Sequence, residues 1–294
     1  MQEQENDILK RVRKIEIKTR GLSNEIFAGK YHTAFKGRGM SFAEVREYRA
    51  GDDVRDIDWN VTARSRKPHI KIYEEERERT MMLLVDVSGS GGFGSVERTK
   101  RNILTEIAAV LAFSAAQTGD KVGCILFSDK VEKFIPPKKG RSHLLTIIRS
   151  LIGFVPESNG TAMSEAVRFL TNANKKRCTA FLLSDFLNPA SDDEALEEAL
   201  KIAGSRHDLM GIRVWDKREA EMPDVGIVEL SDAETGRKVW VDTSSKAVRD
   251  HYAAAWQERE QKIDTLLKHY RMDTAKVATD EDYVAELIKL FKQR

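Results

Sequence analysis

From residue 80 onward, short apolar runs alternate with longer segments whose apolar residues recur at helical spacing. Strands buried on both faces are nearly continuous apolar runs, whereas a helix that covers a sheet is apolar on one side. The predicted strands are residues 80–87, 120–129, 131–137, 176–185, 207–216 and 274–279. The predicted helices are residues 98–119, 142–154, 161–173, 191–204, 244–270 and 280–294. This order predicts a doubly wound α/β fold, with a mostly parallel sheet and helices on both faces.

The segments outside this alternation have other patterns. Residues 9–27 place apolar side chains at helical spacing among Lys and Arg, which predicts a basic helix. Residues 35–80 are rich in Gly, Asp and Arg, and only residues 69–76 alternate as a strand does, so we expect irregular structure there. Residues 225–242 predict a β-hairpin around a Glu-Thr-Gly turn. We therefore expect an N-terminal extension over 1–79, a core over 80–216, and a C-terminal hairpin with helices packed on the core over 217–294.

The charge balance and the cysteines exclude some classes of protein. The formal net charge is only +2 although 33% of the residues are charged, so the surface charge is mixed and nucleic acid is not an expected partner. No apolar run is long enough for a signal peptide or a membrane span. Cys124 and Cys178 lie far apart in apolar stretches, which is typical of buried thiols in a reducing compartment. We expect a soluble cytoplasmic protein.

The stretch DVSGSGGFGS, residues 86–95, fits two kinds of site. From Gly89 it matches GxGxxG, the dinucleotide fingerprint between a strand and a helix. From Asp86 it places oxygen-bearing side chains at alternate positions, with Ser88 and Ser90 as the other two. A carboxylate at the end of the strand would repel pyrophosphate, and Ser114 stands near the position where an acidic residue would hold the ribose. The stretch therefore favours a cation over a dinucleotide.

Two later segments can add ligands to this stretch. Ligands of open α/β sheets bind at the carboxyl ends of the strands, where Thr161 and Asp185 are also expected. Hydroxyl and carboxylate oxygens suit a hard divalent cation, Mg²⁺ or Mn²⁺. The candidate metal ligands are Asp86, Ser88, Ser90, Thr161 and Asp185. A plain helix-capping turn, a metal-dependent hydrolase and a scaffold with a vestigial metal site remain as alternatives.

This combination resembles the von Willebrand factor type A domain with a metal-ion-dependent adhesion site, whose pattern is DxSxS, then a distant Thr, then an Asp after a later strand. The flanking text from residue 35 to residue 76, with the GDKVGCILFSD strand and the DAETG hairpin, resembles the family called domain of unknown function fifty-eight. The resemblance implies a binding or assembly factor and not an enzyme, found in bacteria and associated with a MoxR-type AAA+ ATPase. It also implies that an acidic side chain of a protein partner completes the coordination of the metal.

The acidic segment GDDVRDIDW, residues 51–59, is open to two interpretations. Four carboxylates in seven residues, beside Arg55 and Trp59, are compatible with a second metal or partner site. They are also typical of a structural turn, in which Asp side chains accept hydrogen bonds from local backbone amides and from Arg55. We favour the structural turn, with Trp59 as the anchor of the segment on the domain.

Overall fold

The computed structural model describes residue 13 and residues 40–75, 79–94, 98–232 and 234–293. The basic helix expected over residues 9–27 lies, apart from residue 13, outside the described residues. Among the described residues, no helix combines the length and the apolar character that crossing a bilayer requires.

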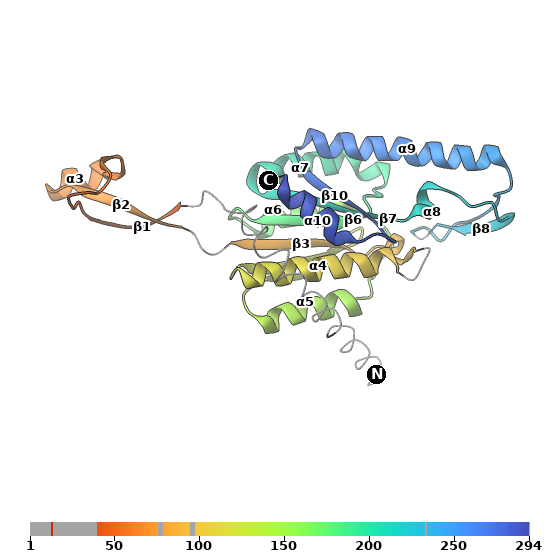
Figure 1. Ribbon diagram of the computed structural model, residues 1–294, viewed down its shortest axis with the longest axis horizontal. Helices are drawn as coiled ribbons and strands as arrows, with labels where there is room; N and C mark the ends of the chain where they lie inside the picture. The colour runs from red at the N-terminus through yellow and green to blue at the C-terminus, as the bar shows by residue number, and fades with distance from the viewer. Residues whose placement is uncertain (1–12, 14–39, 76–78, 95–97, 233, 294) are drawn as a thin grey trace.

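A six-stranded sheet forms the centre of the molecule (Figure 1). Its strands are β3 (Thr80–Asp86), β4 (Lys121–Phe127), β5 (Val131–Lys138), β6 (Thr179–Ser184), β7 (Asp208–Trp215) and β10 (Asp273–Ala278). Their order across the sheet is β10-β7-β6-β3-β4-β5, and only β5 runs antiparallel to its neighbour. The chain moves outward in opposite directions from β3 and β6, so the carboxyl ends of these two neighbours form the topological switch point.

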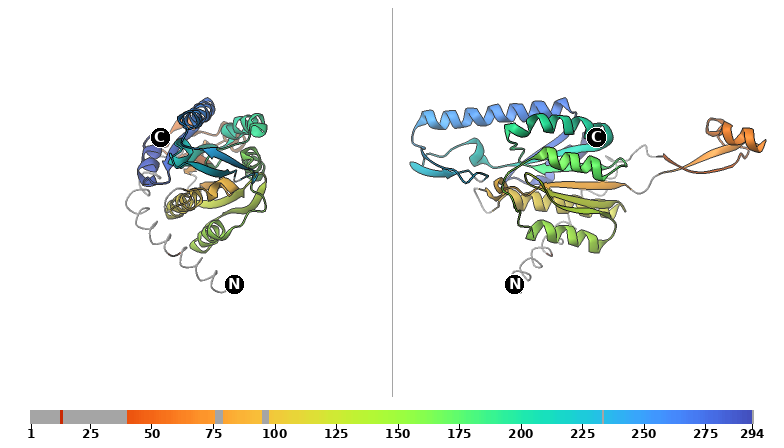
Figure 2. Two further views of the ribbon diagram at one scale, coloured as in Figure 1. Left: turned by 90° about the vertical axis from the view of Figure 1, so that its right-hand side faces the viewer. Right: turned by 180° about the vertical axis from the view of Figure 1, so that it is seen from behind.

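Helices cover both faces of this sheet, as the end-on view in Figure 2 shows. The helices are α4 (Lys100–Gln117), α5 (Arg141–Gly153), α6 (Met163–Ala173), α7 (Asp193–Arg206), α9 (Lys246–His269) and α10 (Tyr283–Lys292). Shorter turns are η3 (Gly89–Gly92), η4 (Ala190–Asp192) and α8 (Lys217–Ala220). The α/β expectation, with a mostly parallel sheet between helices, is confirmed.

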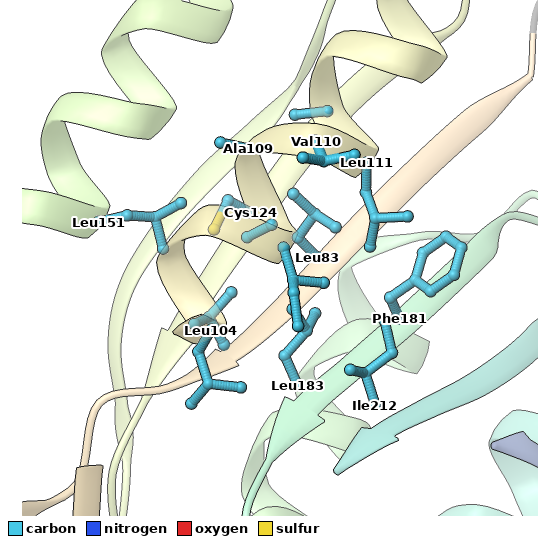
Figure 3. Close-up of a cluster of buried hydrophobic side chains, with 14 of the residues drawn as sticks. Leu83, Leu104, Ala109, Val110, Leu111, Cys124, Leu151, Phe181, Leu183 and Ile212 are labelled. Carbon is cyan, nitrogen blue, oxygen red and sulfur yellow. The ribbon is translucent and has the colours of Figure 1, made fainter. Parts of the chain in front are cut away.

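Alternation along the strands divides the core into two clusters. Leu83 and Leu183 point to the face covered by α4, α5 and α10, where Figure 3 shows them with Leu104 and Phe181. Leu84, one residue along from Leu83, belongs to the opposite cluster, which α6, α7 and α9 cover. Because both faces of the inner sheet are buried, strands β3, β4 and β6 are apolar at nearly every position, which is why the sequence predicts them well.

Helix α4 is apolar on nearly all sides, and most of its residues are buried. It lies against the centre of the sheet with α5 beside it (Figure 3), so little of its surface faces solvent. Thr99 caps its N-terminus by accepting a hydrogen bond from the amide of Asn102. Gly119 follows its C-terminus with a φ of 82°, a conformation that glycine adopts without strain.

The segment of residues 40–75 consists largely of regular elements, so the expectation of irregular structure there was wrong except at residues 69–75, which alternate as a strand does. It contains β1 (Met40–Glu47), η2 (Val54–Asp56), α3 (Trp59–Ser65) and β2 (His69–Glu75). Strands β1 and β2 pair antiparallel, and a bulge between Phe42 and Glu44 interrupts the two-residue period that would have revealed β1. Figure 1 shows this small sheet extending from the end of the domain opposite the carboxyl ends of the strands.

The C-terminal segment contributes both to the sheet and to an extension beyond it. Strand β10 pairs in parallel with β7 as the edge strand, so residues after 216 complete the central sheet. The expected hairpin is present as β8 (Ile227–Ser231) and β9 (Lys238–Asp242). Figures 1 and 2 show it beyond the carboxyl ends of the central strands, below the N-terminal half of α9. The division of the chain at residue 216 stays a prediction.

Candidate metal centre

The carboxyl ends of β3 and β6 bring two acidic residues together. Asp86 ends β3 and Asp185 follows β6, and the two strands are paired neighbours. Both side chains are 4% exposed. Burial, together with the smaller effect of the negative charge of Asp185, raises the pKa of Asp86 to about 6. The sequence expectation that these two carboxylates lie at one place is therefore consistent with the geometry.

Two hydrogen bonds fix the carboxylate of Asp86. Its Oδ1 accepts a bond of 2.9 Å from the backbone N–H of Ser88, and its Oδ2 accepts one of 2.6 Å from the hydroxyl of Ser184. Both bonds favour the ionised form and partly oppose the effect of burial on its pKa. The carboxylate is thus held in a defined orientation while other lone pairs on its oxygens remain available.

The loop after β3 places its two serine hydroxyls side by side. The Oγ atoms of Ser88 and Ser90 lie 3.1 Å apart and share a hydrogen bond, and both residues are buried. The turn η3 forms this part of the loop, and a Cβ could be added at Gly91 or Gly92 without a clash. Glycine is required later, at Gly94, where a Cβ would lie 2.7 Å from Thr99 Cα. The bend around the site therefore comes from a 3₁₀ turn more than from glycine freedom.

The loop before α6 joins the same site. The backbone N–H of Gly89 donates a 3.0 Å bond to the carbonyl of Asn159, which ties the two loops together. Thr161 is only 3% exposed and precedes α6, whose N-cap is Ala162. All five predicted ligands are thus buried at one end of the sheet, on three segments linked by pairing or hydrogen bonds.

A carboxylate from the β8–β9 hairpin also reaches this place. Thr161 Oγ1 donates a 2.7 Å hydrogen bond to Glu234 Oε1, across 73 residues of sequence. Burial raises the pKa of Glu234; the bond from Thr161 opposes this effect, and the charge of Asp185 adds to it. The sequence analysis identified the hairpin but gave no reason to expect Glu234 at the site.

A buried lysine neutralises part of this negative charge. Lys100 is 1% exposed, and its Nζ lies 2.6 Å from Asp185 Oδ2 and 2.5 Å from Glu219 Oε1. Burial alone would lower the pKa of Lys100, but the charges of Asp185 and Glu219 outweigh burial and raise it. The other oxygen of Asp185 accepts a 3.0 Å bond from the amide of Leu187. The sequence did not indicate a role for Lys100 at the site. A polar residue at the predicted start of a helix is common and does not point to a buried ion pair.

A buried arginine supports the same loop from β7. The Nε of Arg213 donates a 3.1 Å bond to the backbone carbonyl of Asp185. Its guanidinium forms an ion pair with Glu260 of α9, and its charge also acts on Asp185 and Glu219. Arg213 therefore positions the backbone at Asp185 and, with Lys100, offsets part of the negative charge of the site.

The chemistry of the cluster fits a hard divalent cation. Four carboxylates, from Asp86, Asp185, Glu219 and Glu234, lie at this end of the sheet with two buried cationic groups, those of Lys100 and Arg213. Burying such an excess of negative charge is costly unless a cation balances it. No group of three or more His, Cys, Asp or Glu side chains in the described part of the chain is placed to hold a metal by itself. A cation here would therefore need the hydroxyl oxygens of the serines and the threonine in addition to the carboxylates.

The GDDVRDIDW segment is a structural turn far from this site. Asp52 accepts bonds of 2.7 and 2.8 Å from Arg46, while Asp53 and Asp58 cap η2 and α3 by accepting backbone amides. These contacts match the favoured interpretation of the acidic residues. The expectation that Trp59 anchors the segment on the domain was wrong. Trp59 is 70% exposed and is the first residue of α3, beside the N-terminal sheet.

Known proteins resemble this chain in sequence or in structure. An uncharacterized protein of Mycobacterium tuberculosis is 29% identical over 287 residues, which cover 96% of this chain and 88% of that protein. The solved structure of the conserved hypothetical protein BatB from Bacteroides thetaiotaomicron is 16% identical, with a TM-score of 0.48, over 73% of this chain and 98% of that one. A von Willebrand factor type A structure from Catenulispora acidiphila is 13% identical, with a TM-score of 0.38, over 50% of this chain and 35% of that one.

The match to a protein family includes the whole candidate site. Residues 44–262 match the family described as "Protein of unknown function DUF58". This range contains Asp86, Asp185 and the hairpin with Glu234, and it covers most of the chain. The protein therefore belongs to the DUF58 family.

Proposed function

We propose that this chain is a protein-interaction module that docks its partner through a divalent cation, Mg²⁺ or Mn²⁺. The ligands are those predicted from the sequence, namely Asp86, Ser88, Ser90, Thr161 and Asp185. The observation that carries the proposal is the pair of buried carboxylates at the switch point, close enough for Asp185 to raise the pKa of Asp86. A structural cap would need only one such carboxylate, whereas a cation site uses both.

Contacts within the protein orient the two carboxylate ligands in the absence of a metal. Ser184 and the amide of Ser88 orient Asp86, and the amide of Leu187 with Lys100 orients Asp185. A cation bound between them would supply positive charge with a coordination position left for a ligand from outside. Prepositioned ligands reduce the entropy lost on binding, so the site suits a structural docking role.

The partner's contribution is expected to be an acidic side chain. A carboxylate is the protein ligand that best satisfies both the charge and the coordination of Mg²⁺. The resemblance to metal-ion-dependent adhesion sites supports this choice, and the family resemblance supports a MoxR-type AAA+ ATPase as the partner. We propose no catalysed reaction for the site. The free, buried thiols of Cys124 and Cys178 support a cytoplasmic location.

The proposal is tested by measuring the binding of the purified MoxR-type ATPase of the same organism by biolayer interferometry, with Mg²⁺ and with EDTA. Binding is expected with Mg²⁺ and not with EDTA, and the double variant Ser88→Ala, Ser90→Ala should not bind in either condition. The matched control is Ser142→Ala, Ser205→Ala, which removes two exposed hydroxyls and should bind as the native protein does. Binding that persists unchanged in EDTA would contradict the proposal. Metal-dependent turnover of p-nitrophenyl phosphate that is lost in Asp185→Ala would favour a hydrolase instead.

A further inference from the structure

The tip of the β8–β9 hairpin places an acidic side chain on one of the proposed metal ligands. Glu234 Oε1 accepts the 2.7 Å hydrogen bond from the hydroxyl of Thr161, and Thr161 is buried. The carboxylate is within electrostatic reach of both Asp185 and Lys100. An acidic side chain from this chain therefore occupies the region where the proposed function requires one from a partner.

The turn of the hairpin is built to present this side chain. Asp232 Oδ1 accepts bonds from the backbone amides of Glu234 and Thr235, at 2.9 and 3.2 Å. The carbonyl of Asp232 accepts a further bond from the amide of Gly236, whose φ of 69° lies in the left-handed region that glycine favours. With its own backbone fixed in this way, Glu234 projects from a defined turn.

The strands behind the tip are attached mainly at their base. None of the residues of β8 and β9 is buried, and Ile227 and Trp240 are 69% and 68% exposed. At the base, the hydroxyl of Thr243 accepts a hydrogen bond from the amide of Val225 and donates one to the carbonyl of Gly226. A hairpin held at its base and tip, with exposed strands between, can release the tip without unfolding the core.

The charges at the tip make a purely structural contact an inadequate explanation. A hydroxyl such as that of Thr161 is satisfied equally well by a neutral amide or hydroxyl acceptor. A carboxylate at this position instead adds negative charge next to Asp185, in a cluster where acids already outnumber cations. A cation at the site would turn this repulsion into attraction, because Glu234 would then be one of its ligands.

We propose that Glu234 is the carboxylate that completes the cation site within the chain itself, and that the hairpin tip must leave Thr161 before a partner's acidic side chain can bind. This inference rests on the proposed function and adds its regulation. The described conformation is the closed form. A ligand tethered to the site competes at high effective concentration. The partner's apparent affinity is therefore its intrinsic affinity multiplied by the fraction of chains in which the tip is open.

The first test follows the hairpin by hydrogen–deuterium exchange, with and without Mn²⁺, in the native protein and two variants. Mn²⁺ is expected to slow exchange of the amides of residues 234–243 in the native protein, and not in Glu234→Gln. The matched control Glu229→Gln makes the same change on the same hairpin, at an exposed residue paired with Lys238, and should behave as native. Calorimetric titration should show Mn²⁺ binding weakened about tenfold in Glu234→Gln, as expected for the loss of one charged ligand.

The second test uses fluorescein-labelled hexaglutamate as the acidic probe in the presence of Mn²⁺. Glu234→Gln should bind this probe more tightly than the native protein by fluorescence anisotropy, because the internal competitor is gone. The double variant Asp86→Asn, Glu234→Gln should lose that gain, which excludes a general effect of the removed charge.

The outcomes separate this inference from the function on which it rests. Mn²⁺ that binds the native protein, with hairpin exchange unchanged and with equal affinity for Glu234→Gln, would overturn the role of Glu234 and leave the cation site standing. Failure of the native protein to bind Mn²⁺ at all would overturn both. An equal affinity of the hexaglutamate probe for native protein and Glu234→Gln would overturn the competition between the hairpin and the partner.

Discussion

The ammonium of Lys100 lies 2.6 Å from a carboxylate oxygen of Asp185, and this buried ion pair joins the first turn of α4 to the end of β6. Lys100 also contacts Glu219, at 2.5 Å, just after β7. It is therefore a cation that the chain itself provides at an anionic switch point. Without a metal, the stability of this end of the sheet should depend strongly on Lys100.

Replacing Lys100 with Met tests that dependence. The variant Lys100→Met leaves the buried Asp185 and the part-buried Glu219 without this partner, so the free energy of unfolding in EDTA should fall by about 3–5 kcal/mol. Mn²⁺ should restore more stability to this variant than to the native protein, because the added cation replaces the missing charge. Urea denaturation in EDTA and in Mn²⁺ measures both effects.

The control for this experiment is Lys217→Met. Lys217 forms a 2.6 Å ion pair with Asp280, but its side chain is 58% exposed, so its removal should cost much less stability than the removal of Lys100. Equal losses in the two variants would show that Lys100 has no special role at the site.

The two cysteines should be inert to thiol reagents in the folded protein. Burial raises the pKa of the thiols of both Cys124 and Cys178 to about 12, so at pH 8 the thiolate that reacts is almost absent. An assay with dithionitrobenzoate is expected to detect no rapid reaction at pH 8 and two thiols after unfolding in guanidinium. Rapid labelling of the native protein would contradict the burial of these residues.

The tryptophans should differ in their contribution to stability according to their contacts. Trp59 is 70% exposed, so Trp59→Ala should change the free energy of unfolding by no more than about 0.5 kcal/mol. Trp215 packs against Trp256 with ring centroids 5.2 Å apart, and Lys276 lies 4.6 Å from both ring centroids. Trp215→Ala should therefore cost about 3 kcal/mol. Chemical denaturation of the two variants measures the difference, and a large loss in Trp59→Ala would mean that the N-terminal sheet packs elsewhere in solution.

Most of the central fold was predictable because its signals are local. Strands such as β3 and β6 are buried on both faces and so are apolar throughout, and helices such as α10 have a clear apolar side. The bulge in β1 shifts the register by one residue and thereby hides the alternation. The prediction for Trp59 failed for a different reason. A large aromatic residue usually packs against a domain, but Trp59 lies exposed at the start of a helix.

The candidate site was predictable only in part for a related reason. Asp86 and Asp185 stand at strand ends, so sheet topology alone brings them together. Lys100 and Glu234 reach the site through long side chains or a distant hairpin, and contacts across 85 and 73 residues leave no periodic trace in the sequence. The DAETG turn predicted the hairpin correctly, but its approach to Thr161 depends on tertiary packing.

The most direct measurement for the central claim is calorimetric titration of the metal-free protein with Mn²⁺. We expect one Mn²⁺ bound per chain, with binding lost or weakened at least tenfold in Asp86→Asn, which keeps the size of the side chain but removes its charge. The control Asp53→Asn makes the same change in the cap of η2, away from the site, and should bind Mn²⁺ as the native protein does. A native protein that binds no Mn²⁺, or an Asp86→Asn variant that binds it equally well, would contradict the account.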